Sequence, residues 1–129
     1  MEIEELFKDF TVNGEKIPVA RVKYTGSAKK YVVYSEIDNR AGYFADGTDN
    51  EAVATYYFNV YVYNGSFTAI VKAVKRKLKD AGYVWQGDSS DMYEEDTKYF
   101  HKAITFAKEI LSEKKKEIKD SQERLLQRE

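Results

Sequence analysis

Hydrophobic and polar positions follow a period of two in the middle of the chain, and this pattern predicts β-strands. Residues 31–37 and 52–63 are dense in β-branched and aromatic residues, which favour strands. In the second segment Phe58, Val60 and Val62 form a purely apolar face. The opposite face of the same segment carries Tyr57, Asn59, Tyr61 and Tyr63. Either a covering helix or a neighbouring subunit could bury the tyrosines of this second face.

Residues 67–81 follow a helical period instead. Their apolar side chains recur at helical spacing, at Phe67, Ile70, Val71, Val74 and Leu78. The other face is basic and holds Lys72, Lys75, Arg76, Lys77 and Lys79. Ser66 is predicted as the N-cap, and Gly82 stands where a glycine commonly ends a helix. This is the main helix that the sequence predicts.

Shorter patterns flank these elements. An apolar stripe predicts a helix over residues 1–10, and Asn13-Gly14 indicates a turn. Residues 17–24 are predicted as an edge strand or the start of a strand, because Pro18 donates no ladder hydrogen bond. A short strand is expected at residues 83–85.

The remaining segments are polar or ambiguous. The polar residues 38–50 and the acidic residues 86–96 are predicted as loops. Residues 99–107 fit a strand or a helix by periodicity alone. Residues 109–129 are highly charged, with a thin seam at Leu111, Ile118 and Leu125 that predicts a helix.

Composition excludes several kinds of chemistry. The 129 residues include no cysteine and one histidine, so thiol catalysis, disulfides, iron–sulfur clusters and cysteine zinc sites are absent. The net charge of −1 lacks the basic excess typical of duplex-DNA wrapping proteins. The acidic start lacks the features of a signal peptide, and no apolar run is long enough to span a membrane. A soluble protein of a reducing compartment, or of a particle assembled there, is expected.

Catalytic and metal motifs are also missing. No two glycines have dinucleotide-loop spacing, and there is no phosphate loop or serine elbow. Residues 46–57 fail as a calcium loop, because glycine is not sixth and Tyr57 stands where the closing glutamate belongs. His101 with nearby carboxylates could serve a hydrolase, although a lone histidine is more often structural. The basic face of the main helix could bind nucleic acid, although such faces are more often solvated. No enzyme activity, metal or cofactor is expected.

The segment Asp91-Met-Tyr-Glu-Glu-Asp-Thr-Lys-Tyr-Phe-His-Lys resembles a segment of small tail proteins from phages and prophages of Gram-positive bacteria. The resemblance covers residues 1–108, because the helix, Ile17-Pro18-Val19-Ala20, the aromatic strand and Ala81-Gly82-Tyr83-Val84-Trp85 occur in the family's order. The motif residues are Tyr93, Glu94, Asp96, Thr97, Tyr99 and His101. In that family this segment enters the last strand, so the resemblance implies a strand over residues 98–107.

These proteins resemble tail completion or tail-to-head joining proteins. The implied fold is α+β, a small sandwich in which helices cover one face of a mixed or antiparallel four- to five-stranded sheet. The domain would comprise residues 1–108, followed by a charged helical extension over residues 109–129. A head-closure or neck component of the same connector is the main alternative, and a non-viral nucleic-acid-binding module is a weaker one.

The resemblance also implies partners and a location. The chain would form a ring, a hexamer on the particle, that contacts the tail tube protein and the head connector protein. Double-stranded DNA would pass through the lumen without specific binding, and no membrane would be involved. The protein would reside in the virion tail or neck, and in the host bacterial cytoplasm during assembly.

Two groups of residues are the candidate contact sites. Tyr57, Tyr61 and Tyr63 are predicted to lie at a subunit interface, because tyrosine combines an apolar ring with a polar tip. Polar and acidic loop residues are predicted to face the lumen or a partner, where like charge would keep DNA from sticking. These residues are Asp38, Asn39, Arg40, Asp46, Asp49, Glu51, Asp88 and Asp91.

Overall fold

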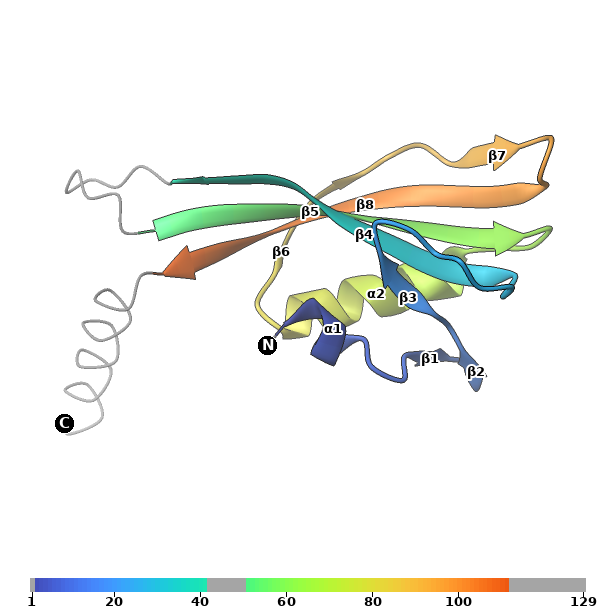
Figure 1. Cartoon of the computed structure of the whole chain (residues 1–129), viewed down its shortest axis with the longest axis horizontal. Helices are drawn as coiled ribbons and strands as arrows, with labels where there is room; N and C mark the ends of the chain where they lie inside the picture. The colour runs from blue at the N-terminus through green and yellow to red at the C-terminus, as the bar shows by residue number, and fades with distance from the viewer. Residues whose placement is uncertain (1, 42–50, 112–129) are drawn as a thin grey trace.

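A twisted mixed sheet organises the part of the chain that the computed structural model describes, residues 2–41 and 51–111 (Figure 1). In spatial order its strands are β3 (Val19–Arg21), β4 (Lys30–Ala41), β5 (Glu51–Tyr63), β8 (Tyr99–Leu111) and β6 (Val84–Asp88), and β7 (Met92–Glu94) also pairs with β8. Strand β3 runs parallel to β4, and every other pair is antiparallel. The α+β class is confirmed, but the sheet has six strands where four or five were predicted.

The remaining elements lie together on one side of this sheet (Figure 1). They are α1 (Ile3–Leu6), α2 (Thr68–Asp80) and a small separate hairpin made of β1 (Thr11–Val12) and β2 (Glu15–Lys16). The turn of that hairpin is Asn13-Gly14, as predicted, and both residues have positive φ. The sheet therefore has one covered face and one face that these helices leave open.

The core lies between α2 and the covered face. Phe58 at the centre of β5 has Tyr34 of β4 and Ile104 of β8 as its cross-strand partners. All three side chains are buried. The apolar stripe of the main helix packs onto this layer through Ile70, Val71, Val74 and Leu78. The purely apolar face of β5, with Phe58, Val60 and Val62, is therefore its buried face.

The helix predicted over residues 67–81 is confirmed as α2, with a shifted start. Phe67 occupies the N-cap position, so the prediction of Ser66 was wrong by one residue. The Ser66 hydroxyl still accepts a hydrogen bond from the Thr68 N–H at 3.3 Å. The predicted helix over residues 1–10 is also wrong beyond Leu6, since Asp9 adopts a φ of 55° and the chain turns into the β1–β2 hairpin. Phe10 lies beyond the helix but is still buried in the hydrophobic core.

The strands are longer than the sequence predicted. Residues 38–41 continue β4 and are not the loop that was expected, while residues 42–50 lie outside the described part. The acidic segment 86–96 is likewise not all loop, because it contributes the end of β6 and all of β7. The strand predicted over 98–107 is confirmed as β8. It continues to Leu111, so residues 109–111 are strand and not helix, and residues 112–129 lie outside the described part.

Candidate functional site: an uncovered aromatic face of the sheet

The face of the sheet that points away from α2 carries a line of aromatic rings. Tyr31 of β4 stands directly opposite Tyr61 of β5, and Tyr61 stands directly opposite His101 of β8. Side chains of successive strand residues point to opposite faces, so these three rings lie on the side away from Val60 and Val62. Three strands that are distant in sequence thereby place three rings side by side.

The rings form a continuous stack, which we call the aromatic row: Tyr24, Tyr31, Tyr61 and His101. Ring centroids are 4.5 Å apart for Tyr24–Tyr31, 5.0 Å for Tyr31–Tyr61 and 5.0 Å for Tyr61–His101. The interplanar angles are 26°, 18° and 23° in the same order, so every pair is stacked. Tyr99 meets the row edge-on, at 5.7 Å from Tyr31. Stacked and edge-on contacts of this kind stabilise an aromatic cluster beyond its buried area.

His101 ends the row and is fixed by a carboxylate. Its Nε2 lies 3.3 Å from Glu94 Oε1, and its Nδ1 is buried with no hydrogen-bond partner among the described residues. The imidazole therefore lies beside the Glu94 carboxylate and stacks on the Tyr61 ring.

The half-buried Tyr31 and Tyr61 of the row stay neutral over the physiological pH range. Burial raises the pKa of Tyr61, and the nearby Glu94 carboxylate raises it further. Burial also raises the pKa of Tyr31, with smaller contributions from the neighbouring tyrosines and Glu94. A raised tyrosine pKa keeps the phenol protonated, so this face offers uncharged rings and hydroxyl groups to a partner.

The three tyrosines that the sequence singled out all lie on this face. Tyr57 and Tyr63 are exposed, whereas Tyr61 is half-buried within the aromatic row. Sequence reasoning missed Tyr24 and Tyr31. Tyr31 stands out only once the register of β4 against β5 is known, because that register places it opposite Tyr61.

The family-motif residues build the hairpin that joins β7 to β8. Tyr93 pairs with Phe100 and Glu94 pairs with Tyr99 across the two strands. Glu94 also accepts a hydrogen bond from the Thr97 hydroxyl at 2.8 Å, which fixes the connection. Lys98 closes the turn with a φ of 61° and a bond from its N–H to the Glu94 carbonyl. The exposed Asp96 lies within this turn. The motif therefore positions Glu94 against His101 and completes the aromatic row.

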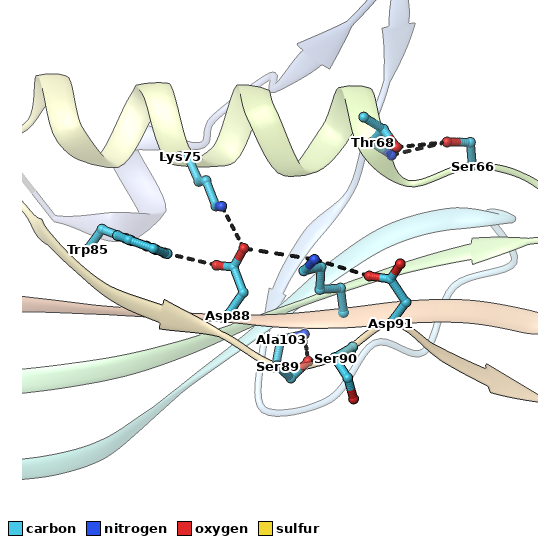
Figure 2. A network of polar contacts seen from close by, with 10 residues as sticks. Ser66, Thr68, Lys75, Trp85, Asp88, Ser89, Ser90, Asp91 and Ala103 are labelled. Carbon is cyan, nitrogen blue, oxygen red and sulfur yellow. Dashed lines mark hydrogen bonds and ion pairs between the residues drawn. The ribbon is translucent and has the colours of Figure 1, made fainter.

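Two of the predicted loop carboxylates take part in a polar network beneath the opposite face (Figure 2). Asp88 accepts hydrogen bonds from Lys75 of α2 at 2.6 Å and from the Trp85 indole at 2.9 Å. Lys102 lies 3.9 Å from Asp88 and 3.1 Å from Asp91. Asp88 thus links the helix to the sheet, while Asp91 stays exposed at the rim of the network.

The other predicted loop residues are placed only in part. The backbone of Asp38, Asn39 and Arg40 belongs to β4, and that of Glu51 to β5, but their side chains are outside what the structure describes. Asp46 and Asp49 lie wholly outside the described residues. Their lumen-facing role stays a prediction.

The described residues hold no metal centre of the usual kind. In residues 2–41 and 51–111, no group of three or more His, Asp or Glu is arranged to bind a metal ion. Within the same ranges, none of the helices has both the length and the apolar character needed to cross a membrane. No protein-family model matches the chain, and no curated protein matches it.

Proposed function

We propose that this protein is a structural component of a phage tail, a tail completion protein that caps the tail tube and joins it to the head connector. The observation that carries the proposal is the uncovered aromatic face, a row of stacked rings on the side of the sheet that the helices leave open. The resemblance of residues 91–102 to small phage tail proteins supports the same assignment, since this segment builds the edge of that face.

The chemistry of the face suits protein contact. Tyrosine gives a large contact area at a low entropy cost, because its side chain has few rotatable bonds. Tyr57 and Tyr63 offer exposed rings beside the preformed aromatic row. Lys29 lies 5.1 Å from the Tyr63 ring and adds a cation at one end of the surface. A neighbouring subunit, the tail tube protein or the connector protein would bury these groups in the particle.

The basic face of α2 gives less support to a nucleic-acid-binding role. Lys75 is directed at Asp88 and lies 5.1 Å from the Trp85 ring, so it acts inside the fold. Lys72, Arg76 and Lys79 are exposed, as expected for a solvated helix face. In the proposed ring, double-stranded DNA passes through the lumen without specific binding.

Deletion of the gene from its phage or inducible prophage is expected to leave heads and tails unjoined. Electron microscopy of the lysate and a titre of infectious particles measure this outcome. Complementation by the variant Tyr57→Ala/Tyr63→Ala is expected to fail or to recover few particles. Truncating a buried interface aromatic commonly costs about 2 kcal/mol or more, which is about 30-fold in affinity.

The matched control is Tyr57→Phe/Tyr63→Phe, which keeps both rings and should restore joining. Normal infectious particles from the deletion would contradict the proposal. Intact tails beside heads that have lost their DNA would instead place the protein on the head side of the same connector.

A further inference from the structure

The sheet ends in two free edges on opposite sides. One is β3 and the other is the run of β6 and β7 along β8. Three strands lie between β3 and β6, so the two edges are about 19 Å apart. In the described part of the chain no further strand pairs with either edge. Such edges present unpaired backbone groups that can pair with another chain.

The hydrogen bonds of β3 show which backbone groups face outward. Val32 donates to the Pro18 carbonyl at 2.9 Å, and the Val22 N–H donates to Tyr34 at 2.8 Å. Because alternate residues of a parallel strand bond to the same neighbour, the N–H groups of Val19 and Arg21 point away from β4. This edge is short: Val22 follows it with a φ of 66°, and the Arg21 carbonyl already accepts a hydrogen bond from the Lys23 N–H at 2.7 Å.

Exposed apolar side chains gather at the same two edges. On the β3 side, Val22 is 71% exposed and Ile37 of β4 is 44% exposed. On the β6–β7 side, Val84, Trp85 and Tyr93 are 60%, 47% and 48% exposed. The other large exposed apolar side chains of the described residues, Tyr57 and Tyr63, belong to the aromatic face. Exposed apolar groups along a free edge indicate a contact surface.

The two edges also differ in charge. Residues 17–35, which include β3, contain four basic residues and no acidic one: Arg21, Lys23, Lys29 and Lys30. Arg21 lies 3.7 Å from Glu4 and 3.8 Å from Glu36, and Lys30 lies 3.0 Å from Glu15, whereas Lys23 is exposed next to Val22. Residues 84–96, which form the other edge, contain five acidic residues and no basic one: Asp88, Asp91, Glu94, Glu95 and Asp96. Lys75 pairs with Asp88 and Lys102 pairs with Asp91 within the chain, whereas Glu95 and Asp96 are exposed. Complementary patches of this kind select a partner and fix its orientation.

We propose that the β3 edge of one copy binds the β6–β7 edge of a second copy, so that the sheets of neighbouring subunits join head to tail. The inference rests on the proposed function and names the contact that would build its ring. The two patches differ, so the contact is heterologous, and repetition closes a ring or extends a filament. Backbone hydrogen bonds would supply affinity, and the opposite charges would exclude edge pairings of like kind.

Because the chain contains no cysteine, an introduced cysteine is its only thiol, and the inference can be tested by cross-linking of the purified full-length chain. The variants Val22→Cys and Val84→Cys each place one thiol on one edge, at an exposed side chain. Treatment with a short flexible bis-maleimide reagent is followed by denaturing electrophoresis. Each single variant should stay monomeric, an equimolar mixture of the two should give dimers, and the double variant should give a ladder of multimers.

Three results would overturn the inference: no cross-linked product in the mixture and in the double variant, dimers from Val84→Cys alone, or dimers from Val22→Cys alone. Circular dichroism establishes that each variant is folded. A second, independent measurement uses Lys23→Glu, which should lower the cross-linking yield of the double variant. The added change Glu95→Lys should restore that yield. Because cross-linking is measured without phage, its failure leaves the joining experiment standing, and a ladder together with normal deletion particles overturns the proposed function alone.

Discussion

Replacement of Phe58 by alanine is expected to lower the free energy of unfolding by about 3–5 kcal/mol. Phe58 is completely buried at the centre of β5, the middle strand of the order β3-β4-β5-β8-β6. Its ring lies 5.6 Å from that of Tyr34 and 5.8 Å from that of Phe7. Removal of the ring would leave a cavity between the sheet and the N-terminal segment, which the surrounding backbone can fill only in part.

Urea denaturation followed by circular dichroism measures this loss. The matched control is Tyr57→Ala, the adjacent residue on the opposite face, whose exposed ring should contribute far less to stability. A loss below about 1 kcal/mol for Phe58→Ala would contradict the burial that the structure assigns to this ring.

Replacement of Asp88 by asparagine is expected to lower the free energy of unfolding by about 2 kcal/mol at neutral pH. The Asp88 side chain is only 18% exposed, and it accepts bonds from Lys75 and Trp85. The asparagine variant leaves Lys75 facing an uncharged group in a half-buried site. Loss of a hydrogen bond to a charged partner is costly in such a setting, since the remaining charge is only partly rehydrated.

The same substitution should show a defined pH dependence. Burial by itself would raise the pKa of Asp88, but the hydrogen bonds from Lys75 and Trp85 and the charges of Lys75 and Lys102 outweigh it and lower the pKa. A lowered carboxyl pKa contributes stability above the unfolded pKa of about 3.9, and this stability is lost as the pH falls through the folded value. The difference between wild type and Asp88→Asn should therefore shrink from about pH 4 downward.

Unfolding free energies measured at pH 7 and at several acidic values test this expectation. Asp91→Asn is the matched control, since this exposed carboxylate pairs with Lys102 at 3.1 Å and should contribute less than about 1 kcal/mol. A difference between wild type and Asp88→Asn that is constant with pH would show that Asp88 is not ionised in the folded network.

The local hydrophobic pattern predicted the main helix and the long strand, whereas the other strands depend on pairing with distant segments. The helical stripe of α2 and the alternation of β5 are each contained in one segment, so the sequence alone identified them. Segment 86–96 is polar and was predicted as loop. Its residues 86–88 and 92–94 form strand because β8 supplies backbone partners, and that pairing overrides local propensity.

For the candidate site, too, one part could be predicted from a single segment of sequence and another part required the fold. Tyr57, Tyr61 and Tyr63 share one face by alternation, which is visible along a single strand. The aromatic row depends on register between strands, since Tyr31 and His101 meet Tyr61 only through β4 and β8. The role of Asp88 also required the fold, because Lys75 reaches it from a different element.

The late position of β8 in the sequence determines when the sheet can be completed during synthesis. The residues that pair between β5 and β8 are 36 positions apart in sequence at Tyr63–Tyr99 and 60 positions apart at Glu51–Leu111. A chain emerging from the ribosome must therefore complete α2 and the β6–β7 segment before β5 gains its second neighbour. Until then the central strand keeps one side open and the core lacks Ile104 and Phe106. Nascent chains that stop before Tyr99 are the form most exposed to edge-to-edge aggregation, so the timing of synthesis is part of how this fold is reached safely.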